Sequence, residues 1–242
     1  MNDVRLIGTA ITPELRAAQD RLLSRPDVPG PSAADLAAEV QEGRRRLLAE
    51  LLARVGQRYF AATLENYQAA CPKQREVVAA LTAYADQFQA ERAAGNGIVL
   101  FGSSGTGKDH LLLGAARLAI VKHGARIVWR NGVDLFAEWR DLIGGEGSEM
   151  SRVYHYARPD VLILSDMLPL GEEVTAFQRQ VLLQIIDFRY RQCRPTWLSL
   201  NVQNGEEAIG RMGMALFDRI CHGTLVRFCN WPSYRAAKAR KL

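Results

Sequence analysis

The stretch Ile98-Val-Leu-Phe-Gly-Ser-Ser-Gly-Thr-Gly-Lys-Asp109 joins an apolar run to a glycine-rich turn, and it decides the fold. Residues 102–109 match the pattern G-x-x-x-x-G-K between an expected strand and an expected helix, the context that this motif requires. Glycines let the backbone wrap around phosphate oxygens, and the N–H groups of the turn and helix start supply positive potential. The alternative is a chance glycine-rich turn. We expect a nucleotide-binding loop made of Gly102, Ser103, Ser104, Gly105, Thr106, Gly107, Lys108, Asp109 and His110.

After Pro72, short β-branched and aliphatic runs alternate with helical patterns. The runs expected to be strands are 98–101, 125–129, 161–164, 196–200 and 225–228. The segments expected to be helices are 73–92, 107–123, 133–143, 173–191 and 206–221. Strands that alternate with helices form a parallel sheet covered on both faces. The predicted fold class is therefore α/β, with a five-stranded parallel sheet between helices.

The segment Asp160-Val-Leu-Ile-Leu-Ser-Asp166 has the form of the second motif of a phosphate-loop protein, in which an acid follows an apolar strand. The acid that usually orders Mg²⁺ is here Ser165, and the acid that usually polarises the attacking water is here Asp166. The Ser or Thr that usually follows the loop lysine and ligates Mg²⁺ is here Asp109. We expect the two changes to compensate, so that a carboxylate and a hydroxyl still face the metal with their positions exchanged. Two independent losses in a degenerate site are the alternative. The expected metal residues are thus Asp109, Ser165 and Asp166.

Three further polar residues are candidates for the same site. Asn201 ends the fourth expected strand, where it can hold the attacking water against the γ-phosphate, although Asn is also a common turn residue. Arg219 lies near the end of a helix and can reach the γ-phosphate of a neighbouring subunit in a ring-forming ATPase; a surface pair with Asp218 is the alternative. Arg235 can contact the nucleotide of its own chain. The expected catalytic residues are Asp166, Asn201 and Arg219.

The first part of the chain has a different pattern from the rest. A helical pattern begins at Pro13 and ends in a Pro- and Gly-rich break. Ser32 can cap a second helix that runs to Val55 with a leucine stripe. We therefore expect a small helical domain at 1–70, followed by a nucleotide-binding domain at 71–242.

Composition excludes several protein classes. The chain has 242 residues, 48% of them hydrophobic and 24% charged, which is ordinary for a globular protein and excludes collagen, wholesale disorder and a coiled-coil rod. No apolar run is long enough to cross a bilayer, and no signal-peptide pattern opens the sequence. The four cysteines form no CxxC pair, which indicates reduced thiols and a cytoplasmic protein. The net charge of +5 is a mild indication of an anionic partner.

The ordered motifs carry a family resemblance. GSSGTGKDHLL, DVLILSD, RPTWLSLN, LFDRI and NWPSYR together resemble the AAA+ ATPases of the DnaC-type replicative helicase loaders and the related IstB-type transposition helper ATPases. The resemblance covers about 58–242 and implies an AAA+ P-loop domain with no C-terminal lid domain. It implies that Lys108 is the phosphate-loop lysine and Asn201 the sensor-1 residue. It further implies that Arg219 is the arginine finger, Arg235 the sensor-2 arginine, and ATP with Mg²⁺ the cofactors.

The resemblance also implies a function and partners. The protein would load a hexameric replicative DNA helicase onto single-stranded DNA in replication initiation, with ATP-controlled assembly and release. Its N-terminal domain would bind the helicase, its ATPase domains would self-assemble, and 136–140 and 149–156 would face DNA. No membrane partner is expected. Ser165 and Asp109 suggest slow hydrolysis. The functions that stay open beside this one are a transposition helper on duplex DNA, a nucleotide-binding adaptor with weak or no hydrolysis and, more distantly, a small-molecule kinase.

Overall fold

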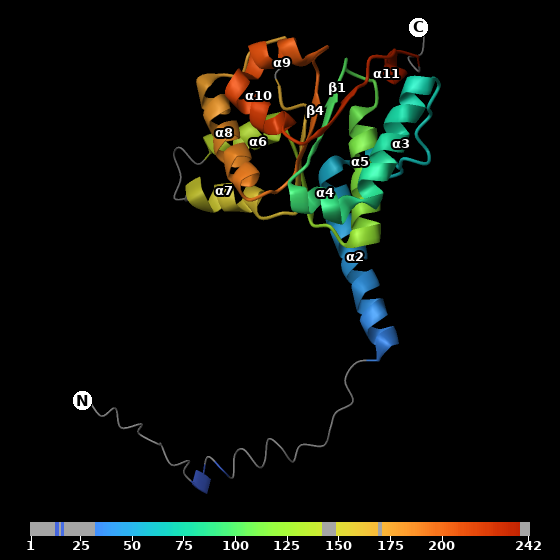
Figure 1. Cartoon of the computed structure of the whole chain (residues 1–242), viewed down its shortest axis with the longest axis vertical. Helices are drawn as coiled ribbons and strands as arrows, with labels where there is room; N and C mark the ends of the chain where they lie inside the picture. The colour runs from blue at the N-terminus through green and yellow to red at the C-terminus, as the bar shows by residue number, and fades with distance from the viewer. Residues whose placement is uncertain (1–12, 15, 17–31, 142–148, 169–170, 238–242) are drawn as a thin grey trace, which may run out of the picture. The chain divides into compact units, whose positions relative to one another are not determined.

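The computed structural model describes residues 13–14, 16, 32–141, 149–168 and 171–237. Five strands form one parallel sheet in the order β2-β3-β4-β1-β5, as Figure 1 shows. Their bounds are β1 (Ile98–Phe101), β2 (Ile127–Asn131), β3 (Val161–Ser165), β4 (Thr196–Leu200) and β5 (Leu225–Phe228). The predicted α/β class with a five-stranded parallel sheet is therefore confirmed.

The helices match the expected segments with three differences. The segment expected at 73–92 is two helices, and the segment at 206–221 breaks at Gly213, whose φ of 90° ends one helix and precedes the next. The helices α7 and α11 lie outside the segments expected to be helices. The helices that follow residue 70 are α3 (Pro72–Asp86), α4 (Phe88–Ala94), α5 (Lys108–His123), α6 (Gly132–Arg140), α7 (Glu149–Ala157), α8 (Ala176–Arg191), α9 (Gly205–Met212), α10 (Met214–Cys221) and α11 (Tyr234–Ala237).

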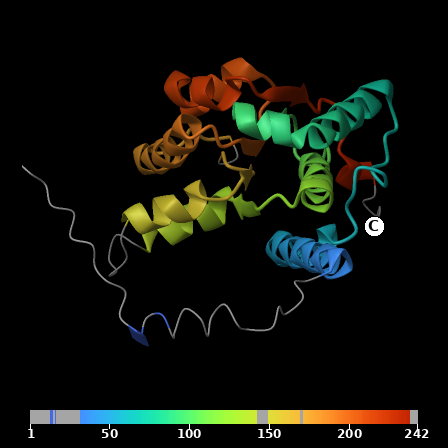
Figure 2. The same ribbon diagram turned by 60° about the horizontal axis from the view of Figure 1, so that its bottom comes forward.

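Two apolar layers cover the two faces of the sheet. Alternate residues of a strand point to opposite faces, so Ile98 and Leu100 of β1 pack with α3, α4 and α5. Val99 and Phe101 pack instead with the helices α6 to α10. Figures 1 and 2 show the two helical layers on either side of the sheet. This arrangement holds the carboxyl ends of β1, β3 and β4 side by side, where an α/β fold places its ligands.

The helix α2 (Ala33–Val55) precedes the sheet. The predicted cap at Ser32 is present, because its hydroxyl accepts the backbone N–H of Asp35 at 3.2 Å. Contacts divide the chain into compact units at residues 1–41 and 42–242. In the second unit, Leu51 is 1% exposed within the same core as α5. Residues 42–70 therefore pack as part of the unit that carries the sheet. The helix expected from Pro13 falls mostly outside the described residues.

Among the residues that the structure describes, no helix is both long and apolar enough to span a bilayer.

A buried arginine joins α8 to the amino ends of β3 and β4. The side chain of Arg189 is 0% exposed. Its Nε donates to Thr196 Oγ1 at 3.0 Å. Its two terminal nitrogens donate to the backbone carbonyls of Tyr156, Ala157, Pro159, Asp160 and Pro195. One guanidinium thus donates to several carbonyls that are buried away from water. Arginine suits this role because its planar group carries five N–H donors.

We predict that Arg189→Met lowers the free energy of unfolding by about 3 kcal/mol or more, because each buried carbonyl left without a donor costs on the order of 1–3 kcal/mol. The matched control is Arg191→Met on the same helix, where an exposed pair with Asp187 is lost; a change of under ~1 kcal/mol is expected there. Urea denaturation followed by circular dichroism measures both variants. Equal losses would show that Arg189 does not have the stabilising role described here.

Candidate functional site

The phosphate loop surrounds the ammonium group of Lys108. Its Nζ donates to the carbonyl oxygens of Gly102 and Ser103 and to Oδ1 of Asn201, each at 2.8 Å. Lys108 is 5% exposed, and this burial lowers its pKa. The predicted lysine at the start of α5 and the predicted Asn at the end of β4 are therefore brought together at the carboxyl edge of the sheet.

Asp109 lies beside the ends of β3 and β4. Ser165 Oγ donates to its Oδ1 at 2.8 Å, and Ser199 Oγ donates to the same oxygen at 2.9 Å. Burial raises the pKa of Asp109, and the negative charge of Asp166 raises it further. Asp109 and Ser165, which the sequence predicts to face the same metal, are thus in direct contact, and their approach to a metal stays a prediction. Sequence reasoning missed Ser199, which looks like one more residue of a buried strand.

Asp166 is the other carboxylate of the site. It has a φ of 47°, a left-handed conformation that is uncommon outside glycine. Its backbone N–H donates to Ser199 Oγ at 3.1 Å, and its Oδ1 accepts from Asn201 Nδ2 at 2.7 Å. The side-chain amide of Asn201 therefore bridges Lys108 and Asp166: its Oδ1 accepts from Lys108, and its Nδ2 donates to Asp166. These contacts place both predicted water-orienting residues in one network.

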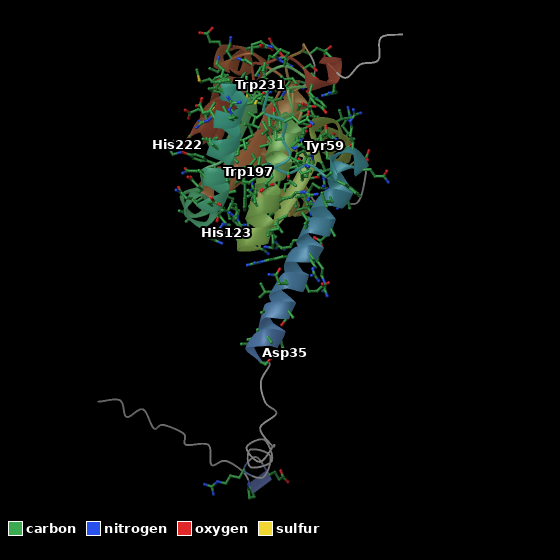
Figure 3. All side chains as sticks on the ribbon, turned by 90° about the vertical axis from the view of Figure 1, so that its right-hand side faces the viewer. Asp35, Tyr59, His123, Trp197, His222 and Trp231 are labelled. Atoms are coloured by element: carbon green, nitrogen blue, oxygen red, sulfur yellow. The ribbon has the colours of Figure 1, made fainter. Side chains whose placement is uncertain are left out.

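Lys108, Asp109, Asp166 and Asn201 line a cavity of about 490 Å³. Another wall comes from the segment that follows α2 and from the segment that follows β5. The residues of that wall are Arg58, Tyr59, Ala61, Ala62, Asn66, Tyr67, Gln68, Trp231, Pro232, Tyr234 and Arg235. Tyr59 lies where α2 ends (Figure 3). The apolar and aromatic part of the wall gives the cavity a surface against which a flat base can pack.

Sequence reasoning did not place residues 58–68 in the site. The signals were their aromatic content just before a phosphate-loop domain and the family resemblance, which begins at about residue 58. The structure joins them to the loop, because Tyr67 Oη donates to the Thr106 carbonyl at 3.0 Å and Trp231 Nε1 donates to the same carbonyl at 2.8 Å. Burial raises the pKa of Tyr67 to about 12, which keeps its hydroxyl neutral and able to donate. The segment before α3 and the segment after β5 thus both hold the loop, through the same carbonyl of Thr106.

Two further predicted residues, Arg235 and His110, also line the cavity. Arg235 donates to Ser104 Oγ at 3.3 Å and lines the cavity. Its contact with the nucleotide of its own chain stays a prediction. His110 also lines the cavity, with Nε2 2.8 Å from the Thr63 carbonyl and 3.0 Å from Asn66 Oδ1. His110 therefore links the first turn of α5 to the segment before α3.

Arg219 lies elsewhere in the chain. It is on α10, with Nε 3.0 Å from Asp187 Oδ1 on α8, and it does not line the cavity of its own chain. The sequence offers a surface pair with Asp218 as the alternative role of Arg219. In the structure the partner of Arg219 is Asp187 instead. A role for Arg219 at a nucleotide must therefore be played in another subunit.

For the aromatic residues of 136–140 and 149–156, the sequence allows stacking on DNA bases or packing in the core, and it favours core packing. Trp139 is 3% exposed and Tyr156 is 0% exposed, so both pack in the core. Tyr154 is 41% exposed, and the guanidinium of Arg158 lies 5.7 Å from its ring centroid. Only Tyr154 of these three offers a substantial ring surface to a ligand.

The chain matches the IstB-like ATP binding protein family over residues 38–241. It belongs to this family. A replicative helicase loader DnaC of Buchnera aphidicola subsp. Schizaphis graminum is 25% identical over 96% of this chain and 92% of its own length. A putative insertion sequence ATP-binding protein of Sinorhizobium fredii is 29% identical over 61% of this chain and 49% of its own length. The predicted resemblance to this group is confirmed.

Comparison with solved structures supports the fold. The crystal structure of the DnaC helicase loader has a TM-score of 0.65 and 22% sequence identity, and it covers 72% of this chain and 99% of that chain. At this identity the likeness establishes the AAA+ fold. Family and fold together make the chain an ATP-binding AAA+ protein.

We predict that Gly105→Ala weakens ATP binding by about tenfold or more, since strain of about 1–3 kcal/mol would displace the loop. Gly105 has a φ of 85°, and an added Cβ would lie 2.0 Å from Ser233 Oγ. The control is Gly124→Ala, with a φ of 67° and nothing within 4 Å of its Cβ, so that only backbone strain is added. Fluorescence titration with a labelled ATP measures both. Equal affinities would rule out the close packing of the loop against the segment after β5 as a requirement for binding.

Proposed function

We propose that this protein is a cytoplasmic, ATP-dependent loader of a hexameric replicative DNA helicase onto single-stranded DNA in replication initiation. The observation that carries the proposal is a phosphate loop whose buried lysine is bonded to Asn201, in a chain similar over nearly its whole length to a replicative helicase loader. The AAA+ fold it shares with the DnaC helicase loader supports the same function. ATP binding controls assembly on the helicase, and hydrolysis controls release.

The chemistry of the cavity suits ATP with Mg²⁺. Two carboxylates and a hydroxyl are oxygen donors of the kind that Mg²⁺ prefers, and Mg²⁺ usually takes one or two carboxylates together with phosphate oxygens and water. Asp109 and Asp166 would hold the ion, Ser165 would support Asp109 through their hydrogen bond, and the ion would neutralise charge on the phosphates. Lys108 and the loop N–H groups bind the phosphates, and the aromatic wall holds the base. Asp166 and Asn201 orient the attacking water, and Arg235 stabilises the phosphates from the same chain.

Hydrolysis requires a second subunit in this proposal. Arg219 is 35% exposed at its side chain and outside the cavity of its own chain, so it is available to a neighbouring nucleotide. An arginine supplied in this way stabilises charge in the transition state. The ATPase domains therefore assemble side by side, with each Arg219 completing the next site.

The segment 1–70 is proposed to bind the helicase. Leu36 and Val40 of α2 are 49% and 52% exposed, although both are apolar. By the helical repeat, they continue the stripe of Leu47 and Leu51. An apolar stripe that is exposed in the free chain offers a partner a surface to bury.

Single-stranded DNA is proposed to contact α7 and its surroundings. Tyr154 is exposed and Arg158 lies over its ring. An aromatic ring stacks on a base, and an arginine binds a phosphate. These two residues are the basis for placing DNA on this side of the domain.

We predict that Leu36→Asp weakens co-elution with the replicative helicase of the same source in Mg²⁺-ATP by about tenfold or more, because a charge would be buried in an apolar contact. The control is Ala38→Asp, which adds the same charge to the opposite face of the exposed helix. Size-exclusion chromatography with light scattering measures both complexes. Residues 42–70 are kept intact, because they pack in the unit that holds the site. No complex with the unmodified protein in any nucleotide state would contradict the loader function.

We predict that Arg219→Ala and Lys108→Ala each abolish DNA-stimulated ATPase activity, and that an equimolar mixture recovers part of it. In the mixture, some sites combine Lys108 of one chain with Arg219 of the next. Steady-state phosphate release measures the recovery. A mixture as inactive as the separate variants would contradict an arginine supplied by the neighbour.

A second candidate function is a transposition helper ATPase on duplex DNA. The similarity to a putative insertion sequence ATP-binding protein favours it over an adaptor without turnover or a small-molecule kinase. Fluorescence anisotropy with duplex and single-stranded oligonucleotides separates the loader from the helper. Preference for duplex DNA, together with no helicase complex, would support the helper. ATP binding without turnover under any of these conditions would instead support a nucleotide-binding adaptor.

A further inference from the structure

Two serine hydroxyls from neighbouring strands converge on one oxygen of Asp109. Ser165 at the end of β3 and Ser199 in β4 donate to Oδ1 at 2.8 and 2.9 Å. Ser165 is 4% exposed and Ser199 is 0% exposed, so both hydroxyls are withdrawn from water. A buried hydroxyl needs a fixed partner, and here the partner of both is the same carboxylate oxygen.

The arrangement leaves the other carboxylate oxygen available. Both serine bonds end on Oδ1, and over the described parts of the chain no hydrogen bond from the protein ends on Oδ2. Asp109 lines the cavity together with Lys108 and Asp166. Metal-binding carboxylates in proteins are usually held in place by hydrogen bonds from neighbouring side chains. Asp109 has this arrangement, because it lines the cavity while two serines donate to one of its oxygens.

We propose that Ser165 and Ser199 are positioning residues that seat Asp109 as the carboxylate ligand of nucleotide-bound Mg²⁺, so that this acid comes from α5 instead of β3. The proposal rests on the proposed binding of Mg²⁺-ATP. Ser199 has a second contact, because its oxygen accepts the backbone N–H of Asp166 at 3.1 Å. Ser199 therefore fixes the metal ligand and the water-orienting residue to the same point of β4.

The first test is Ser199→Ala in the full chain. The affinity of the protein–nucleotide complex for Mg²⁺ should fall about tenfold, as is usual when an outer hydrogen bond to a metal ligand is lost. Affinity for the labelled nucleotide in EDTA should stay within about twofold, because Lys108 and the loop amides are unchanged. Thr82→Ala removes a hydroxyl bonded to the Val78 carbonyl in α3 and serves as control. Fluorescence titration with Mg²⁺ and paramagnetic resonance with Mn²⁺ report on the site. An unchanged Mg²⁺ affinity would overturn the proposal.

The second test moves the proposed metal-binding carboxylate from α5 to the end of β3, where phosphate-loop proteins usually have it. Asp109→Thr alone should weaken Mg²⁺ binding about tenfold or more, and Asp109→Thr with Ser165→Asp should restore it to within about threefold. In that double variant, Ser199→Ala should change the Mg²⁺ affinity by less than about twofold, because Ser199 no longer acts on the metal ligand.

Two results of this second test would also overturn the proposal. A double variant no better than Asp109→Thr would show that the acid has not been exchanged. An equal loss from Ser199→Ala in both backgrounds would show that Ser199 acts through Asp166 and not through Asp109. Either result would leave nucleotide binding in EDTA intact, whereas failure of the proposed function would appear as no ATP binding by the unmodified protein.

Discussion

The site depends on one buried positive charge. Lys108 begins α5, and its ammonium group is held at 2.8 Å by two carbonyls of the loop and by Asn201 at the end of β4. Because a buried ammonium group must be fully hydrogen-bonded, these contacts fix the loop between β1 and β4. The phosphate-binding N–H groups, Asp109 in the next position of α5, and the Asn201–Asp166 contact all follow from this arrangement. The aromatic residues before α3 and after β5 then hold the loop from outside through the Thr106 carbonyl.

Local patterns predicted the frame of the molecule. Apolar runs alternate with helical repeats, so the parallel sheet and the position of the phosphate loop follow from sequence. The departures at Asp109 and Ser165 could also be recognised, because both residues lie at defined positions of known motifs. The role of Ser199 could not be predicted, because no sequence pattern shows that a serine inside a buried strand will hydrogen-bond to a residue of another element. Arg189 was hidden for the same reason, because its carbonyl partners come together only when α8 packs on the sheet.

The N-terminal part shows why boundaries are harder to predict than elements. The leucine stripe of α2 predicts a helix, but periodicity does not say which surface covers the stripe. Leu51 packs in the core that contains α5, whereas Leu36 is exposed. One helix thus carries both a core contact and an open apolar stripe. The segment that follows it lines the nucleotide cavity, so the expected boundary at residue 70 stays a prediction about partner binding.

The proposed exchange of metal-site residues is tested most directly by a crystal structure of the protein with Mg²⁺ and a non-hydrolysable ATP analogue. We predict that the phosphates lie in the loop at Lys108 and that a carboxylate oxygen of Asp109 lies about 2.1 Å from Mg²⁺, with Ser165 and Ser199 still donating to the other oxygen. A structure in which Mg²⁺ is bound without Asp109, while that carboxylate stays on the serines away from the metal, would contradict the exchange.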